Sequence, residues 1–163
     1  MQNAIIVLHE SAIGPGHDFR DYLLKKKIKR ILFIAHPLLN DPRNRKKTSR
    51  LELYDFGKKS EELFFIHLPL PTHVRYILDV PITLYWSLKY MDYADIFVGL
   101  DSLNAFTGIL LRMISRVQSV YYYAIDYIPQ RSPRRIINTI YHGLEYMAAR
   151  FSDATWNLSP RMI

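Results

Sequence analysis

Ser119-Val120-Tyr121-Tyr122-Tyr123-Ala124-Ile125 decides the fold of this 163-residue chain. The stretch is apolar and aromatic, which is typical of a buried strand. It runs into the polar loop Asp126-Tyr127-Ile128-Pro129, and a helical stretch from about Pro133 to Arg150 precedes a short strand over Ala154–Leu158. This order of elements is the repeat of a parallel α/β sheet, whose loops at the strand ends form binding sites.

The same alternation of strands and helices extends back to the N-terminus. Continuous apolar runs such as Ile31–Ala35 and Ile96–Leu100 predict strands buried on both faces of a mostly parallel sheet. Strands are also expected over Ala4–His9, Leu63–Leu68 and Asp95–Leu100. Helical spacing begins at Phe19 and is expected again over His73–Met91 and Asn104–Arg116. Leu51, Leu53 and Phe56 alternate loosely with polar residues, which suggests an edge strand in a β-rich insertion. We therefore predict one α/β domain, a Rossmann-like, doubly wound sheet with helices on both faces.

Composition limits the class of protein. The chain is 49% hydrophobic and has no cysteine, so it has neither disulfides nor a thiolate metal site. Its longest weakly charged tract, Tyr76–Leu88, is shorter than the roughly 20 apolar residues that a membrane span requires. We expect a cytoplasmic protein without a transmembrane helix.

Positive charge is concentrated in residues 20–50. This segment holds eleven Lys and Arg against two acidic residues, a net +9, whereas the whole chain is +7. A solvated surface that maintains solubility would explain it, as would a patch for anionic lipid headgroups or a phosphorylated substrate. The residues assigned to this patch are Lys25, Lys26, Lys27, Arg45, Lys46 and Lys47.

Gly14-Pro15-Gly16-His17 lies between the first strand and the first helix. Glycine allows close approach of a phosphate or sugar, and a helix N-terminus favours anions. A dinucleotide fingerprint would require a small residue at Phe19 and an acid about 20 residues later, and both are missing. We therefore predict a substrate-binding loop and no nicotinamide or flavin cofactor. An ordinary tight turn would explain the same residues.

Two further strand ends carry polar side chains. Asp101, Ser102 and Asn104 follow Asp95–Leu100, where they can bind sugar hydroxyls or, in the case of Asp101 or Ser102, simply cap a helix. Asp126 follows Ile125 and is the predicted catalytic carboxylate, with Tyr127 beside it as a substrate-binding residue. The alternative for Asp126 is a structural role within its own turn.

Other sites are not indicated. His9, His36 and His67 each lie at or near a predicted strand end, but their spacing is not that of metal ligands and no acidic cluster accompanies them. No metal site is therefore predicted. No RNA-recognition signature occurs, so nucleic acid is not an expected partner. The aromatic helix over His73–Met91 can pack on the sheet or dock on anionic lipid together with the basic segment.

Taken in order, these motifs resemble the N-terminal domain of GT-B glycosyltransferases, and family 4 most of all. The resemblance spans nearly the whole chain. Four features carry it: the loop Gly14–Gly16, the strand from Ala94 that leads to Asp101–Ala105, the strand that ends before Asp126, and the run Glu145–Ala154 followed by Trp156-Asn157-Leu158-Ser159. Many family members have histidine where this chain has Asp126.

The resemblance implies a function. It implies transfer of a sugar from a nucleotide-sugar donor to a glycan or lipid-linked acceptor, with retention of anomeric configuration and no metal or other cofactor. The N-terminal domain would supply most of the acceptor site. The C-terminal donor-binding domain of the family is not found in residues 1–163, so this domain is expected to be inactive alone, and Ser159 would lie at the hinge.

One alternative belongs to another class of protein. The chain can instead be a stand-alone Rossmann-like interaction module that binds anionic lipid or polymer through residues 20–50. The basic segment is consistent with both readings, since it also favours a membrane-surface acceptor and a peripheral location on the inner face of the membrane.

Overall fold

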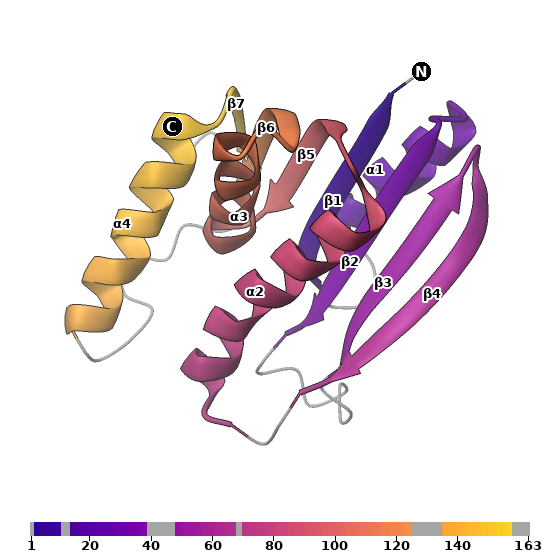
Figure 1. The fold of residues 1–163 in the computed structure, drawn as a ribbon. Coiled ribbons are helices and arrows are strands. Elements are labelled where there is room, and N and C mark those ends of the chain that lie inside the picture. The colour runs from indigo at the N-terminus through magenta and orange to yellow at the C-terminus, as the bar shows by residue number, and fades with distance from the viewer. Residues whose placement is uncertain (1, 11–13, 39–47, 68–69, 125–134, 158–163) are drawn as a thin grey trace.

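The computed structural model describes residues 2–10, 14–38, 48–67, 70–124 and 135–157. Figure 1 shows one sheet with helices on both faces. The elements in chain order are β1 (Asn3–Glu10), α1 (Pro15–Lys25), β2 (Arg30–Pro37), β3 (Thr48–Asp55), β4 (Lys58–Ile66), α2 (Thr72–Tyr90), β5 (Ala94–Leu100), α3 (Ser102–Met113), β6 (Val117–Ala124), α4 (Arg135–Phe151) and β7 (Ala154–Asn157).

The seven strands lie in the order β4-β3-β2-β1-β5-β6-β7. β1 pairs in parallel with both β2 and β5, and the parallel ladder continues through β6 to β7. β2 to β3 and β3 to β4 are antiparallel pairs. The predicted α/β class and mostly parallel sheet are therefore confirmed.

The edge strand is β4 and not the predicted strand around Leu51–Phe56. β3 is paired on both sides, and β4 is the edge strand of this antiparallel hairpin. Phe56 belongs to neither strand, since it lies in the hairpin turn with φ at 51°, before Gly57 at 82°. Leu51 is fully buried because β3 is internal, whereas most residues of β4 are exposed or half-buried.

Alternate side chains of the strands build two cores. Ile5 and Val7 of β1 point to the face covered by α2 and α3, where they join Trp86 and Ile109. Their neighbours Ala4, Ile6 and Leu8 point to the opposite face, where they pack with Leu23 of α1. Figure 1 shows α1 on the far side of the sheet from α2. This alternation decides which strand-end residues can meet under α2.

Close packing of α3 on the sheet depends on Gly99 in β5. A Cβ atom added there would lie 2.3 Å from the backbone nitrogen of Ala105. Real Cβ atoms do not approach backbone so closely, so any side chain at this position would push α3 away from the sheet. Gly99 therefore helps to place the first turn of α3, which carries Asn104.

We predict that Gly99→Ala destabilises the protein by about 2 to 3 kcal/mol because α3 must move. Gly143→Ala is the matched control: nothing lies within 4 Å of the new methyl group, and alanine favours the helix by about 0.5 to 1 kcal/mol. Urea unfolding followed by circular dichroism measures both changes. Equal stability of the two variants would show that the contact at Ala105 is not a constraint.

Candidate functional site

A row of polar side chains forms the last layer under α2 at the carboxyl edge of the sheet. His9 and His36 are register partners at the ends of β1 and β2. Ser49 is the second residue of β3, and His67 directly follows β4. These residues continue the same alternation as Val7, Ile34 and Leu51, so they occupy the face that α2 covers. The apolar core thus ends in a polar layer.

α2 supplies the matching polar surface. Arg75, Asp79, Thr83 and Ser87 recur every four residues on one side of the helix, and all are buried. Residues four apart lie on the same helical face, which explains the stripe. We call the polar row and its helical partners, His9, His36, Ser49, His67, Asp79 and Thr83, the Asp79 cluster.

Asp79 lies at the centre of this cluster, and its side chain is 1% exposed. Its Oδ2 accepts a hydrogen bond from Nε2 of His9 at 3.0 Å. Its Oδ1 lies 3.3 Å from Nδ1 of His36 and 3.6 Å from Nε2 of His67. The Ser49 hydroxyl bridges the same two nitrogens, at 2.7 and 2.6 Å. A buried carboxylate requires hydrogen-bond partners because water cannot solvate it, and here His9 supplies one to Oδ2 while Oδ1 has none.

His9 also bonds to a second carboxylate, on the neighbouring parallel strand. Its Nδ1 lies 2.5 Å from Oδ2 of Asp101, which follows β5. The ring of Tyr76 stacks on His9, with centroids 4.6 Å apart. β1 and β5 are adjacent, and the helices that follow them, α1 and α3, lie on opposite faces. This is the topological switch point, where doubly wound sheets bind ligands.

Asp101 is held in an uncommon backbone conformation. Its φ of 131° lies in the region that favours glycine, which costs on the order of 1 to 3 kcal/mol. Its Oδ1 accepts from the backbone N–H of Asn104 at 2.9 Å, so it caps α3. Its Oδ2 accepts from the side-chain amide of Asn104, also at 2.9 Å. The capping role expected from the sequence is thus confirmed, and the contact with His9 adds to it.

The histidines of the Asp79 cluster differ in charge. Burial alone lowers the pKa of His9, but the charges of Asp101 and Asp79 and their hydrogen bonds outweigh burial and raise it to about 9. Burial, together with the charges of His9 and His67, lowers the pKa of His36 well below its usual 6.5. Burial also lowers the pKa of His67, although Asp79 opposes that shift. At neutral pH, His9 is therefore a cation and the other two histidines are neutral.

Arg75 brings a second buried positive charge to this edge. Its side chain lies close enough to His67 for its charge to lower the pKa of that imidazole. Its Nε and Nη1 are buried and have no hydrogen-bond partner, and no carboxylate of the described residues lies within 4 Å of its guanidinium. Burying an unpaired guanidinium costs several kcal/mol, so this position is suited to an anionic ligand.

The other predicted site residues lie near His9 and the start of α3, on the α1 face of the sheet, or outside the described residues. Asp101 and Asn104 join His9, whereas Ser102 is buried in the first turn of α3. Gly14 precedes the N-terminus of α1, and Gly16 packs against Leu8 and Leu100 on the α1 face. His17 lies beside Phe33 on that same face, and Pro15 is the first residue of α1. Asp126 and Tyr127 lie outside the described residues.

The structure describes part of the basic segment. Lys25, Lys26 and Lys27 are exposed at the end of α1, beside the amino end of β2. Arg45, Lys46 and Lys47 lie outside the described residues, in the stretch that joins the carboxyl end of β2 to β3. Charge is also compensated, since Arg20 and Arg50 pair with Glu52 and Arg30 pairs with Asp55.

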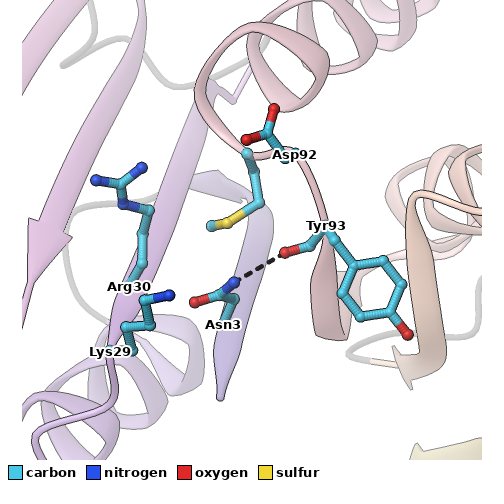
Figure 2. Close-up of a pocket in the computed structure, with 6 residues that line it drawn as sticks. Asn3, Lys29, Arg30, Asp92 and Tyr93 are labelled. Carbon is cyan, nitrogen blue, oxygen red and sulfur yellow. Dashed lines mark hydrogen bonds between the residues drawn. The ribbon is translucent and has the colours of Figure 1, made fainter. Parts of the chain in front are cut away.

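A separate hollow of about 320 Å³ lies at the opposite, amino edge of the sheet. Figure 2 shows Asn3, Lys29 and Arg30 facing Asp92 and Tyr93, and the Asn3 side chain donates to the Tyr93 carbonyl at 3.0 Å. These residues start β1 and β2 or precede β5. Ligands of doubly wound sheets bind at the carboxyl edge, so we assign the candidate site to the Asp79 cluster and its neighbour Asp101.

Comparisons of the chain with protein-family models, with curated proteins and with solved structures gave no match. Within the described residues, no helix is long and apolar enough to cross a membrane. The candidate site is therefore interpreted from its own geometry and chemistry.

The free energy of unfolding is predicted to fall as the pH rises from 6.5 to 9 in metal-free buffer. The raised pKa of His9 means that its stabilising contribution is complete below pH 6.5 and lost through pH 9, by about 3 kcal/mol. His36 and His67 have lowered pKa values, so they destabilise the fold when pH drops below 6.5. Urea unfolding at stepped pH values measures the curve. His9→Gln should flatten the alkaline limb, and an unchanged alkaline limb in that variant would contradict the assignment.

Proposed function

We propose that this chain is the acceptor-side domain of a glycosyltransferase that uses a nucleotide-sugar donor. The observation that carries the proposal is the meeting of Asp101, Asn104 and His9 at the switch point between β1 and β5. Carboxylate and amide groups are the partners that sugar hydroxyls require, and this edge is where doubly wound sheets bind substrates. The resemblance of the sequence to GT-B family 4 domains points to the same class.

His9 has a positioning role in this proposal. It already carries a proton at neutral pH, so it cannot accept the proton of an acceptor hydroxyl. Its two N–H groups instead fix the carboxylates of Asp79 and Asp101. Asp101 has the more exposed side chain, 16% against 1% for Asp79, so it is the one we assign to the acceptor.

The transfer itself exchanges two bonds. The acceptor hydroxyl bonds to the anomeric carbon of the donor sugar, the bond from that carbon to the diphosphate breaks, and the nucleoside diphosphate leaves. Asp126 is our proposed proton acceptor for the hydroxyl. The nucleotide would bind mainly to a donor domain joined to this one, and closure of the two domains would exclude water.

Arg75 supports an acceptor that carries phosphate. An unpaired buried guanidinium is poorly solvated, and a phosphate would give it both a counter-ion and bidentate hydrogen bonds. A phosphate-bearing lipid acceptor also suits the outer side of α2, where Ile77, Leu78, Tyr85 and Leu88 are exposed beside Lys89. Apolar and aromatic residues with a flanking lysine are typical of helices at a membrane surface.

The interaction-module alternative has weaker support. It requires residues 20–50 to act as one basic surface, but among the described residues Arg20 and Arg50 are paired with Glu52, and Arg30 is paired with Asp55. It also assigns no role to the buried Asp79 cluster. We therefore retain the transferase proposal.

The full-length protein is predicted to transfer sugar, and Asp101→Asn should reduce kcat/KM by about 100-fold because a charged acceptor of hydrogen bonds is lost. Asparagine still caps a helix, so the fold should persist.

The assay offers radiolabelled UDP-, GDP- and ADP-hexoses with a membrane lipid extract, and NMR of the product reports the anomer, for which retention is expected. His142→Gln, a change at a partly exposed residue of α4, is the control. Absence of transfer with every donor, or full activity of Asp101→Asn, would overturn the proposal.

Arg75→Met is predicted to stabilise the unliganded protein by about 1 to 3 kcal/mol, because it removes an unpaired buried charge and keeps the volume. The same change should abolish binding of a sugar phosphate, for which glucose 1-phosphate is the probe in calorimetry. Arg30→Met, which breaks only the half-exposed pair with Asp55, is the control. A destabilised Arg75→Met variant that still binds the probe would give Arg75 a structural role.

A further inference from the structure

Three ligand-type atoms converge in the middle of the Asp79 cluster. Nδ1 of His36, Nε2 of His67 and Oδ1 of Asp79 belong to residues that are all buried, and their ligand atoms lie within 4.8 Å of one another. Asp79 Oδ1 is 3.3 Å from the first nitrogen and 3.6 Å from the second. A tetrahedral ion with ligands at about 2.0 to 2.2 Å separates its ligand atoms by about 3.3 to 3.6 Å. Two edges of the triangle therefore already have the spacing of a zinc site.

Asp79 Oδ1 also lacks the partner that a buried carboxylate oxygen requires. The other oxygen accepts from His9, but Oδ1 is buried and makes no hydrogen bond, despite its short distances to two imidazoles. Such an unsatisfied charged atom is costly in a dry interior. An imidazole nitrogen without its proton is a lone-pair donor like the carboxylate, so a cation between the three atoms satisfies all of them at once.

The surroundings hold the ligands in place. Nε2 of His36 lies 2.7 Å from the Thr83 hydroxyl, which fixes the ring and leaves Nδ1 turned towards Asp79. Outer hydrogen bonds of this kind orient metal-ligating histidines. The Ser49 hydroxyl lies between His36 Nδ1 and His67 Nε2, so it can serve as the fourth ligand or be displaced by water as the imidazoles move together.

We propose that His36, His67 and Asp79 bind one Zn²⁺ ion through Nδ1, Nε2 and Oδ1. Two imidazoles and one carboxylate suit zinc and related first-row ions, whereas magnesium and calcium prefer sites made wholly of oxygen. The ion ties the end of β2 and the residue after β4 to α2, and through Asp79 it connects to His9. This site goes beyond the proposed transferase function, because the resemblance that supports that function implies no metal.

The charge of Arg75 allows a second test, because its removal should change the affinity for zinc in the opposite direction to removal of a ligand. Its positive charge acts on His67 and therefore opposes a cation at this site. Removing that charge strengthens zinc binding, whereas removing a ligand weakens it. Arg75→Met and His67→Gln should thus change the affinity in opposite directions, which a general effect on folding would not do.

The test uses chain prepared without an affinity tag, stripped with chelator and dialysed. Elemental analysis after loading should give one zinc per chain, and Co²⁺ should give the visible absorption of a tetrahedral site. By competition titration, affinity should fall at least tenfold in His67→Gln and in Thr83→Val, and rise several-fold in Arg75→Met. His142→Gln, which changes a histidine paired with Glu145 on the surface, should bind normally.

These measurements distinguish a loss of zinc binding from a loss of folding. Amide NMR spectra first verify that each variant is folded, and Thr83→Val gives a second reading because it removes no ligand. A folded wild-type chain that retains no zinc after dialysis and shows no tetrahedral Co²⁺ spectrum overturns the proposal. So does zinc binding that is equal in wild type, His67→Gln and Thr83→Val.

Discussion

The buried carboxylate of Asp79 is the constraint on which the site depends. It lies on the sheet side of α2, where the rest of the helix packs on apolar strands, and it is almost completely removed from water. A charge in that place requires partners with protons or positive charge. His9 supplies one, and through His9 the carboxylate of Asp101, directly after β5, is connected to the same group. One arrangement thereby holds polar residues of β1, β2 and β3, the residues that directly follow β4 and β5, and residues of α2 and α3.

This arrangement is more typical of a ligand-binding site than of residues that only stabilise the fold. Apolar residues of similar volume would usually stabilise a core at least as well as a buried ionic network. The protein instead keeps a carboxylate oxygen and two guanidinium nitrogens without partners, and it holds Asp101 at a strained φ. Such features cluster where ligands bind, because a ligand supplies what the empty site lacks. The transferase and zinc proposals assign different ligands to neighbouring parts of this one edge.

The sequence predicts the fold well because its signal is local. Apolar runs such as Ile31–Ala35 specify strands of a parallel sheet, and the structure confirms them, whereas α1 already begins at Pro15, inside the predicted Gly-rich loop. The edge strand was misplaced because a hairpin turn at Phe56 and Gly57 has weak local preferences. Of the predicted site residues, Asp101 and Asn104 meet at the carboxyl edge because they follow a parallel strand directly.

The Asp79 cluster escaped sequence analysis because its members are far apart in the chain. His9, His36 and His67 follow or end different strands, so their spacing along the sequence is not that of metal ligands, whereas the sheet brings them together. The sequence does contain a signal for these histidines, which is the two-residue alternation along each strand. Each histidine continues the set of alternate residues that forms the core under α2. The burial of Asp79 and Arg75 is not indicated by the sequence. A helix of mixed composition does not show from its sequence which side packs against the sheet.

His9 is predicted to be a cation that bonds to the carboxylates of both Asp79 and Asp101 at the switch point. Nitrogen-15 NMR of the histidine side chains, recorded on metal-free protein at pH 8, tests this prediction most directly. With a pKa of about 9, His9 should show both ring nitrogens protonated, whereas His36 should show one protonated and one bare nitrogen. A neutral His9 at pH 8 would contradict the account, because the two carboxylates would then not be organised around it.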